Sequence, residues 1–397
     1  MASSPAGLPR LRLKKGRLQR LFGGHPWVFS NELQEVPPLE PGTMVAVDGP
    51  GGEPFGTGTF NPRTLIAVRL LARAPEALPE DWLERRLKAA LSRREGLYPG
   101  EACLRLVFGE ADGLPGLVAD RYGDALVLQC LTAGMERLRE RAAAFLKARL
   151  SPRVVVFRGD SPSRELEGLP RTSFLEPEGA APLAEVRYLG LLLEVDLLGG
   201  QKTGLFLDQR ENVRRFLDLL SPGARVLDVF AYRGVWGLSA LRAGAASAEF
   251  VEASDPACRA IEEGLRRNGL PPQPIHGGDA FDVLPFLRRS GKAYDAVVLD
   301  PPAFAKSKKH LPEAEKAYRR LNELGFSLLR PGGLLVTCSC SYHLSREAFR
   351  EIVAGAAARS RRRAHLLEAR GQAPDHPVLL GFPEGDYLKA LFVRADG

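Results

Sequence analysis

The stretch Gly333-Leu-Leu-Val-Thr-Cys-Ser-Cys-Ser341 reads as a buried strand that ends in small polar and sulfur side chains. An apolar run behind a Pro-Gly-Gly turn is typical of a central strand in a parallel α/β sheet. The strand expected before it, Tyr294-Asp-Ala-Val-Val-Leu-Asp300, ends in a carboxylate. In open α/β sheets, ligands bind beyond the carboxyl ends of the strands. We therefore expect the ends of these two strands to face one pocket.

The chain from about residue 200 alternates strands and helices, which predicts a doubly wound, Rossmann-like α/β domain. A helix is expected at 313–329, between the two strands quoted above. The other strands of the sheet are expected at 225–230, 248–252, 274–276, 365–369 and 387–393.

The upstream half of the chain follows two other patterns. Short strands separated by Gly/Pro turns predict a small β-barrel; they are expected at 44–47, 55–60 and 65–71. A helix at 80–95 and a β-β-β-α-β pattern, with its helix at 135–150, indicate an α+β module. The predicted domains are therefore 1–75, 76–195 and 196–397.

Charge is modest in total but uneven in distribution. The 397 residues carry a formal charge of +7, with a pI near 9.2. The basic residues that precede the first acidic residue, Glu32, are Arg10, Arg12, Lys14, Lys15, Arg17 and Arg20. Such a patch favours a nucleic-acid partner, and a solvated surface is the plainer alternative. We expect Arg10, Arg12, Lys14 and Lys15 to contact RNA.

Several classes of protein are disfavoured by composition. No run of about 18 apolar residues is present, so no membrane-spanning helix is expected. The first nine residues lack a signal-peptide pattern, and the five cysteines are odd in number and mostly scattered. These features favour a cytoplasmic protein without disulfides. No His or Cys residues stand at metal-ligand spacing, so no metal site is expected.

The turn after the strand 225–230 contains Gly234 and Gly237 but does not follow G-x-G-x-x-G. This departure disfavours a pyrophosphate cradle and favours a ligand without phosphates, such as S-adenosylmethionine (SAM). Glu252, at the end of the next strand, is placed to accept hydrogen bonds from a ribose diol. Asp279, after the third strand, is expected to bind the adenine amino group. The alternative is a packing turn with surface acids.

The segment Asp300-Pro-Pro-Ala-Phe304 follows a strand directly, and its prolines fix an extended loop without free N–H groups. We expect Phe304 to stack on a flat base and Lys306 to contact phosphates. A rigid connection with solvated lysines is the alternative.

Cys340 has the position that C5 methylation of a pyrimidine requires. Carbon 5 is a weak nucleophile until a thiolate adds at carbon 6. A thiol beside Asp300 could make that bond while the carboxylate assists the ring nitrogen. Buried cysteines more often serve packing, and Cys338, deeper in its strand, keeps that interpretation beside a weaker one as a base.

Motifs along nearly the whole chain resemble those of the bacterial 23S rRNA 5-methylcytosine methyltransferases with an N-terminal PUA (small RNA-binding barrel) domain. They are Gly24-His-Pro-Trp-Val-Phe29, Gly200-Gln-Lys-Thr-Gly-Leu-Phe-Leu-Asp-Gln-Arg210, Asp300-Pro-Pro-Ala-Phe304, Thr337-Cys-Ser-Cys-Ser341, Asp375-His-Pro-Val378 and Glu384-Gly-Asp-Tyr-Leu-Lys389.

The resemblance implies a PUA-like barrel, a central α+β module and a class I methyltransferase domain that binds SAM. It also implies 23S rRNA as the substrate and Cys340 as the nucleophile. The residues that it implies around SAM are Phe206, Arg210, Asp228, Phe230, Tyr232, Glu252, Asp279 and Asp300.

Two positions depart from the family pattern: Val235 stands where a second glycine is usual, and Arg233 where a small polar residue is usual. Bulk there would reshape the methionine end of the pocket or mark a branch with another target nucleotide. Two alternatives therefore stay open, methylation of a base nitrogen without a thiol and an RNA-binding assembly factor with a vestigial SAM site. A homodimer is also left open.

Overall fold

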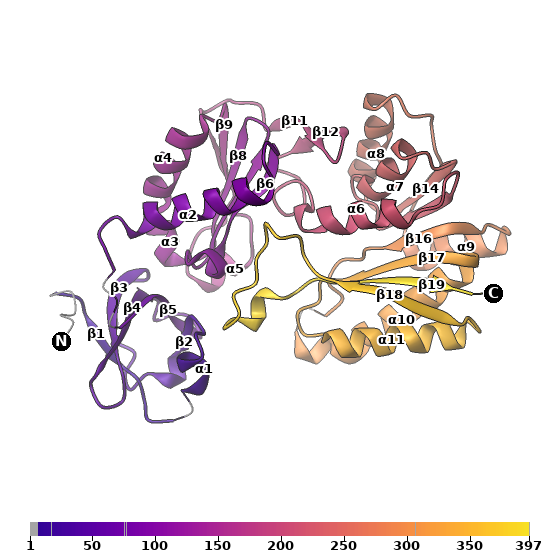
Figure 1. The fold of residues 1–397 in the computed structure, drawn as a ribbon. Coiled ribbons are helices and arrows are strands. Elements are labelled where there is room, and N and C mark those ends of the chain that lie inside the picture. The colour runs from indigo at the N-terminus through magenta and orange to yellow at the C-terminus, as the bar shows by residue number, and fades with distance from the viewer. Residues whose placement is uncertain (1–6, 17, 75, 77, 306, 397) are drawn as a thin grey trace. The chain divides into compact units, whose positions relative to one another are not determined.

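The computed structural model describes residues 7–16, 18–74, 76, 78–305 and 307–396. The chain forms two compact units, each built from segments that are distant in sequence (Figure 1). Unit 1 contains Met1–Glu185, Val195–Leu205 and Pro374–Gly385. Unit 2 contains Val186–Glu194, Phe206–Ala373 and Asp386–Gly397.

The amino-terminal part of unit 1 is a five-stranded sheet with the helix α1 (Gln19–Phe22). Its strands, in spatial order, are β1 (Arg10–Arg12), β3 (Thr43–Asp48), β4 (Pro54–Phe60), β5 (Ile66–Arg73) and β2 (Trp27–Phe29). Two glycines of β4 allow the strands to approach: a Cβ at Gly56 or Gly58 would lie 2.5 or 2.4 Å from a carbonyl oxygen of β5. The expected short strands are confirmed within one or two residues.

The second part of unit 1 is another five-stranded sheet with its own apolar core. Its strands, in spatial order, are β10 (Phe174–Glu176), β9 (Val154–Phe157), β8 (Ala125–Cys130), β7 (Leu117–Tyr122) and β6 (Cys103–Phe108). The helices are α2 (Trp82–Leu97), α3 (Ala133–Arg137), α4 (Arg139–Leu150) and α5 (Ser163–Leu166). The single helix expected at 135–150 was wrong: Thr132 caps α3, and the chain breaks at Leu138 before α4.

Unit 2 is a doubly wound α/β fold, as the alternation of strands and helices predicted. Its seven strands, in spatial order, are β15 (Ile275–Gly277), β14 (Ser247–Glu252), β13 (Arg225–Val229), β16 (Tyr294–Leu299), β17 (Leu329–Ser339), β19 (Lys389–Ala395) and β18 (Ala364–Arg370). Only the pairs made by β19 are antiparallel. Sequence order reverses between β13 and β16, which is where such sheets bind ligands.

In the described part of unit 2, one helix precedes β13 and five helices connect the strands, because parallel neighbours need crossover connections. They are α6 (Arg210–Leu219), α7 (Val235–Arg242), α8 (Asp255–Arg267), α9 (Ala280–Arg289), α10 (Leu311–Leu328) and α11 (Arg346–Arg359). Figure 1 shows α10 and α11 side by side, and α10 also contacts β16 and β17. The Pro-Gly-Gly turn expected before β17 lies inside the strand, at a bulge between the pairs Tyr294–Leu329 and Ala296–Leu334.

A hairpin of β11 (Leu183–Tyr188) and β12 (Leu191–Asp196) precedes β13 in sequence, and its residues 186–194 belong to unit 2. Among the described residues, no helix is long and apolar enough to span a membrane.

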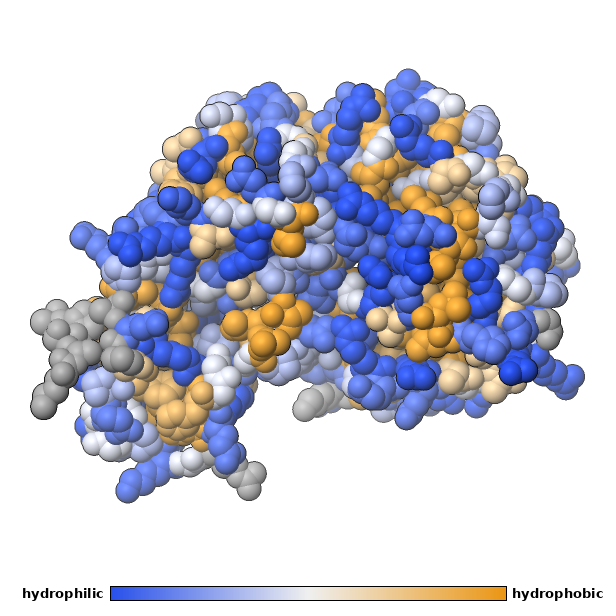
Figure 2. Space-filling model, viewed as in Figure 1, coloured by the Kyte–Doolittle hydropathy of each residue, from blue (hydrophilic) through white to orange (hydrophobic). Residues whose placement is uncertain are grey.

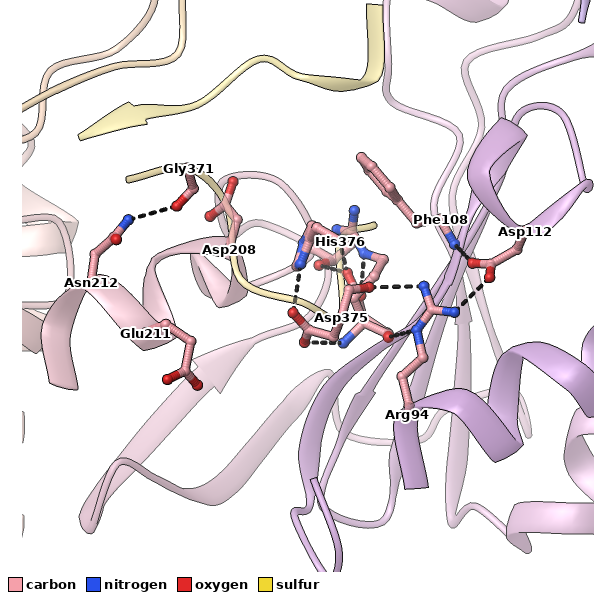
Figure 3. A network of polar contacts seen from close by, with 12 residues as sticks. Arg94, Phe108, Asp112, Asp208, Glu211, Asn212, Gly371, Asp375 and His376 are labelled. Carbon is pink, nitrogen blue, oxygen red and sulfur yellow. Dashed lines mark hydrogen bonds and ion pairs between the residues drawn. The ribbon is translucent and has the colours of Figure 1, made fainter. Parts of the chain in front are cut away.

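The segment Pro374–Gly385, between β18 and β19, belongs to unit 1. The Asp375 carboxylate accepts from the Arg105 N–H at 3.1 Å, and its carbonyl accepts from buried Arg94 at 2.8 Å (Figure 3). Glu384 lies 3.1 Å from His25 Nε2, so the Glu-Gly-Asp motif contacts the Gly-His-Pro motif within unit 1. Leu380 is 99% exposed, and Figure 2 shows apolar surface over this segment.

Candidate active site

The carboxyl ends of β16 and β17 bring Asp300 and Cys340 to one edge of the sheet. Leu299 of β16 pairs with Thr337 of β17, so the segments that follow the two strands begin side by side. The Cys340 sulfur lies 3.9 Å from the Pro301 carbonyl oxygen, and the residue is half-buried. The two strand ends therefore meet as predicted.

Cys338, two residues before Cys340, has a different environment. It is fully buried inside β17. Burial, with the Asp300 carboxylate, raises the pKa of the Cys338 thiol well above its ordinary value. A thiol that stays protonated suits packing and argues against a role as a base.

The turn that carries Cys340, Ser339–Leu344, is held from both sides; we call it the thiol turn. The Ser339 hydroxyl donates to Tyr318 Oη at 3.0 Å, and Ser341 Oγ lies 3.0 Å from the same atom. Ser341 Oγ also accepts from the Ala305 N–H at 3.1 Å. The buried phenol of Tyr318 thus holds the thiol turn to α10, and Ser341 joins the turn to the loop after Asp300.

Lys389, the first residue of β19, is a buried cation beside this turn. Its ammonium donates to the carbonyl oxygens of Ser341 at 2.7 Å and Leu344 at 2.9 Å. Burial lowers the pKa of Lys389 to about 8, Arg346 lowers it further, and Cys340 and Asp386 oppose that change. The sequence motif pointed to this lysine, but its relation to Cys340 arises only from the pairing of β17 with β19.

Asp300 is oriented by two side chains that we did not predict. Gln209 Nε2 donates to both carboxylate oxygens at 3.0 Å, and Trp236 Nε1 donates to Oδ2 at 3.3 Å. Gln209 Oε1 in turn accepts from Asn212 at 2.6 Å, which fixes the orientation of the amide. The Asp-Gln-Arg motif therefore positions the acid at the end of β16.

The Gln-Lys-Thr-Gly half of the same motif lies in unit 1. Thr203 is buried; its hydroxyl donates to Asp120 and lies 2.9 Å from Tyr122 Oη. The Leu205 N–H donates to the same phenol at 3.1 Å. These contacts anchor the chain just before it enters unit 2, a role that hydrophobic periodicity could not indicate.

The loop between β13 and α7, Phe230–Gly234, has a strained backbone. Phe230 and Tyr232 have φ values of +62° and +51°, and Gly234 has +67°. A left-handed backbone in bulky residues concentrates at functional sites, where the surroundings impose it. Glu252 supports the loop through Oε2, which accepts from the Tyr232 N–H at 2.8 Å, while its Oε1 accepts from the N–H of Ser254, after β14, at 2.9 Å.

Asp228, on β13 just before this loop, is a buried acid. Its Oδ2 accepts from the Gly237 N–H at 3.0 Å, and its Oδ1 has no partner among the described residues. Burial raises the pKa of the Asp228 carboxyl to about 8, the Asp300 and Glu252 carboxylates raise it further, and the Gly237 N–H opposes the change. A buried acceptor without a partner points to a ligand that would donate to it.

Comparison with known proteins identifies the family. Residues 148–394 match the S-adenosylmethionine-dependent methyltransferase family, and residues 11–73 match a PUA-like domain. The chain belongs to this methyltransferase family.

Relatives and solved structures agree with that assignment. The chain is 38% identical to "Ribosomal RNA large subunit methyltransferase I" of Shewanella denitrificans, over 97% of this chain and 99% of the relative. It is 37% identical to the protein of the same name from Photobacterium profundum, over 96% and 97%. A solved structure described as a SAM-dependent methyltransferase from Streptococcus mutans shares the fold at 19% identity, with a TM-score of 0.82 over 98% of this chain and all of the other.

The acidic and aromatic groups around the β13–α7 loop fit SAM, the methyltransferase's cofactor. Asp228 offers the unpartnered acceptor, and Glu252 ends β14 as predicted for the ribose. Asp279 is exposed and caps α9 by accepting from Phe281 N–H at 2.7 Å, so one carboxylate oxygen already has a partner.

The other predicted cofactor residues lie near this loop or behind it. The Phe206 ring lies 5.4 Å from the Tyr232 ring, and the Phe230 ring lies 6.4 Å from that of Phe304. Arg210 is fully buried, with its guanidinium 4.8 Å from the ring of Tyr188. This buried position favours a role for Arg210 in holding the site's structure.

Arg233, the departure from the family pattern, has a structural partner. Its guanidinium donates to the Glu194 carbonyl on β12 at 2.7 Å and lies 5.5 Å from the Tyr232 ring. This contact ties the β13–α7 loop to the hairpin.

The residues predicted to contact RNA belong to both units. In unit 1, Arg10 pairs with Asp48, the Lys14 ammonium donates to the Asn31 carbonyl at 3.2 Å, and Arg12 and Lys15 are exposed. In unit 2, Phe304 packs against Phe281, Tyr318 and Phe230, which occupies much of the ring expected to stack on a base. Lys306 lies outside the described residues.

Proposed function

We propose that this methyltransferase modifies carbon 5 of a cytosine in 23S rRNA through a bond between the Cys340 sulfur and carbon 6 of the base. The names of its relatives support large-subunit ribosomal RNA as the substrate. The observation that carries the cysteine mechanism is the half-buried Cys340 beside Asp300, on a turn that Tyr318 and Lys389 hold in place.

The electrons balance as follows. The Cys340 thiolate donates a pair to carbon 6, and the carbon 5–carbon 6 pair moves to carbon 5, which becomes nucleophilic. SAM supplies the methyl group. Afterwards a base takes the proton from carbon 5, the double bond forms again, and the thiolate leaves with the electrons of its bond to carbon 6. In this proposal Asp300 binds the ring nitrogen as its electron density changes, and its contacts with Gln209 and Trp236 support that role.

The test uses unmodified 23S rRNA, methyl-labelled SAM and nucleoside mass spectrometry. Wild type, Cys340→Ala and the matched control Cys338→Ala are compared. We expect label in 5-methylcytidine with wild type and Cys338→Ala and none with Cys340→Ala. RNA containing 5-fluorocytosine should give an adduct that survives denaturing electrophoresis, because the fluorine prevents the last step.

Label in a methylated base nitrogen that persists in Cys340→Ala would overturn the cysteine mechanism. Absence of label, together with no SAM binding in calorimetry, would instead favour an RNA-binding factor.

A further inference from the structure

Unit 2 has an open groove of about 700 Å³ at the carboxyl-terminal ends of three helices. Arg288 comes from α9, Arg320 and Glu323 come from α10, and Arg359 and Arg361 lie at the end of α11. Arg362 also lines the groove. None of these residues belongs to the active site described above.

The groove is strongly positive, with five arginines and one carboxylate among its lining residues. The Arg359 guanidinium lies 3.6 Å from a carboxylate oxygen of Glu323, which makes a weak ion pair. Arg362 donates to the Leu329 carbonyl at 2.7 Å and so is part of the wall. Arg288 and Arg361 are exposed and have no ion-pair partner among the described residues.

Helix ends alone do not account for these arginines. Cations stabilise the last turn of a helix, which explains Arg288 and Arg359. Arg320 lies two turns before the end of α10, with its guanidinium 5.5 Å from the Phe281 ring. Arg361 follows α11 with a φ of +54°, where glycine is the favoured residue. A bulky cation thus stands where the backbone favours glycine.

We propose that this groove binds the phosphate backbone of the RNA substrate, away from the nucleotide that is methylated. Guanidinium groups pair with phosphates through two parallel hydrogen bonds, and several fixed guanidiniums favour a chain of phosphates. The choice of RNA as the polyanion rests on the proposed function.

The separation between the groove and Cys340 indicates how long an RNA must be to contact both. α10 begins after the Asp300 loop and ends at the groove. Arg362 binds the carbonyl of Leu329, the first residue of β17, whereas Cys340 follows the last, so this 11-residue strand separates the groove wall from the thiol. A single nucleotide at Cys340 cannot extend that far, so the groove would contribute to affinity for long RNA and leave the chemical step unchanged.

The test compares a groove variant, Arg288→Gln/Arg320→Gln/Arg361→Gln, with a control of equal charge change, Arg242→Gln/Arg259→Gln/Arg266→Gln, on α7 and α8. Binding to unmodified 23S rRNA is measured by filter retention over a range of KCl concentrations. Each lost phosphate contact lowers the slope of log affinity against log salt by roughly 0.7 to 0.9. We expect a slope lower by about 2 and at least about tenfold weaker binding for the groove variant, with little change for the control.

SAM affinity and the single-turnover rate at saturating RNA should stay unchanged in the groove variant, and a thermal melt checks its folding. Equal losses of RNA affinity in both variants would mean that net charge alone explains the effect, and would overturn the proposal. Unchanged RNA binding in the groove variant would also overturn it. Because retention is scored without chemistry, the result is independent of which atom is methylated. If wild type itself bound 23S rRNA no better than an unrelated RNA, the proposed substrate would fail with it.

Discussion

The thiol turn and the β13–α7 loop are built on opposite principles. In the thiol turn, Ser339, Ser341 and Lys389 have hydrogen-bond partners, so its geometry is maintained by satisfied polar groups. In the β13–α7 loop, Phe230 and Tyr232 hold strained backbone conformations, and Asp228 is buried with one oxygen unpartnered. Strain and unpartnered groups are compensated by ligand binding, whereas a satisfied turn presents one reactive atom in a fixed place. We therefore expect the thiol turn to be disturbed by loss of a hydrogen-bonding side chain. The β13–α7 loop should be disturbed by loss of its ligand.

The largest effect is expected at the acid that lies between these regions. Asp300→Asn keeps the size of the side chain but removes its charge, and we expect methyl transfer to fall about 10²- to 10⁴-fold. Single-turnover rates with saturating RNA and SAM measure this. Asp295→Asn, at the other end of β16, is the control and should stay near the wild-type rate. A loss that excess SAM restored would place Asp300 in cofactor binding alone.

Asp228→Asn should change how stability depends on pH. The pKa of Asp228 rises from 3.8 to about 8 on folding, so its favourable contribution is present below about pH 4 and is lost as pH rises to about 8. The maximum slope is about 1.4 kcal/mol per pH unit. The variant lacks this loss and should be more stable than wild type at pH 8 and similar at pH 4. Urea unfolding at both pH values without SAM measures it, and parallel curves would contradict it.

Gly234→Ala tests the backbone of the β13–α7 loop. The left-handed conformation costs an L-residue about 1–2 kcal/mol, and the added Cβ would lie 3.1 Å from Phe250 and 3.2 Å from Ile261. Gly291→Ala, with a φ of +70° and no neighbour within 4 Å, is the matched control. We expect Gly234→Ala to lose more unfolding free energy than the control and to weaken SAM binding, as calorimetry would show. Equal losses would mean that the loop accommodates the methyl group.

The smallest effect is expected from Lys389→Met, because the thiol turn has other supports. A cation beside Cys340 favours the thiolate, so its removal should slow alkylation of Cys340 by iodoacetamide several-fold near pH 7.5. The alkylation–pH profile should move to higher pH, with Cys340 followed by peptide mass spectrometry. Lys292→Met, whose ammonium pairs with Glu249, is the control. An unchanged alkylation–pH profile would mean that Lys389 binds the backbone of the thiol turn but does not favour the Cys340 thiolate.

Local sequence patterns predicted much of the fold. The alternation of apolar strands and amphipathic helices predicted the doubly wound sheet, and the Gly/Pro turns predicted the short strands of the barrel. The expected helix at 135–150 failed at Leu138, and the turn before β17 proved to be a bulge, because the start of α3 is set by the Thr132 cap and the bulge by pairing with β16. The bulge depends on a neighbouring strand that a short window of sequence does not contain, whereas the Thr132 cap is local to the start of α3.

The sequence by itself determined the residue types at the two strand ends, because an apolar run followed by a polar residue reveals where a parallel strand stops. It therefore indicated Asp300 and Cys340. Only the tertiary structure decided which groups act on them: Gln209 reaches Asp300 from 91 residues away, and Lys389 reaches the thiol turn through the β17–β19 pairing. The same holds for the arginine groove, whose members are spread over three helices. Periodicity describes neighbours along the chain, whereas hydrogen bonds and charge depend on distances in space.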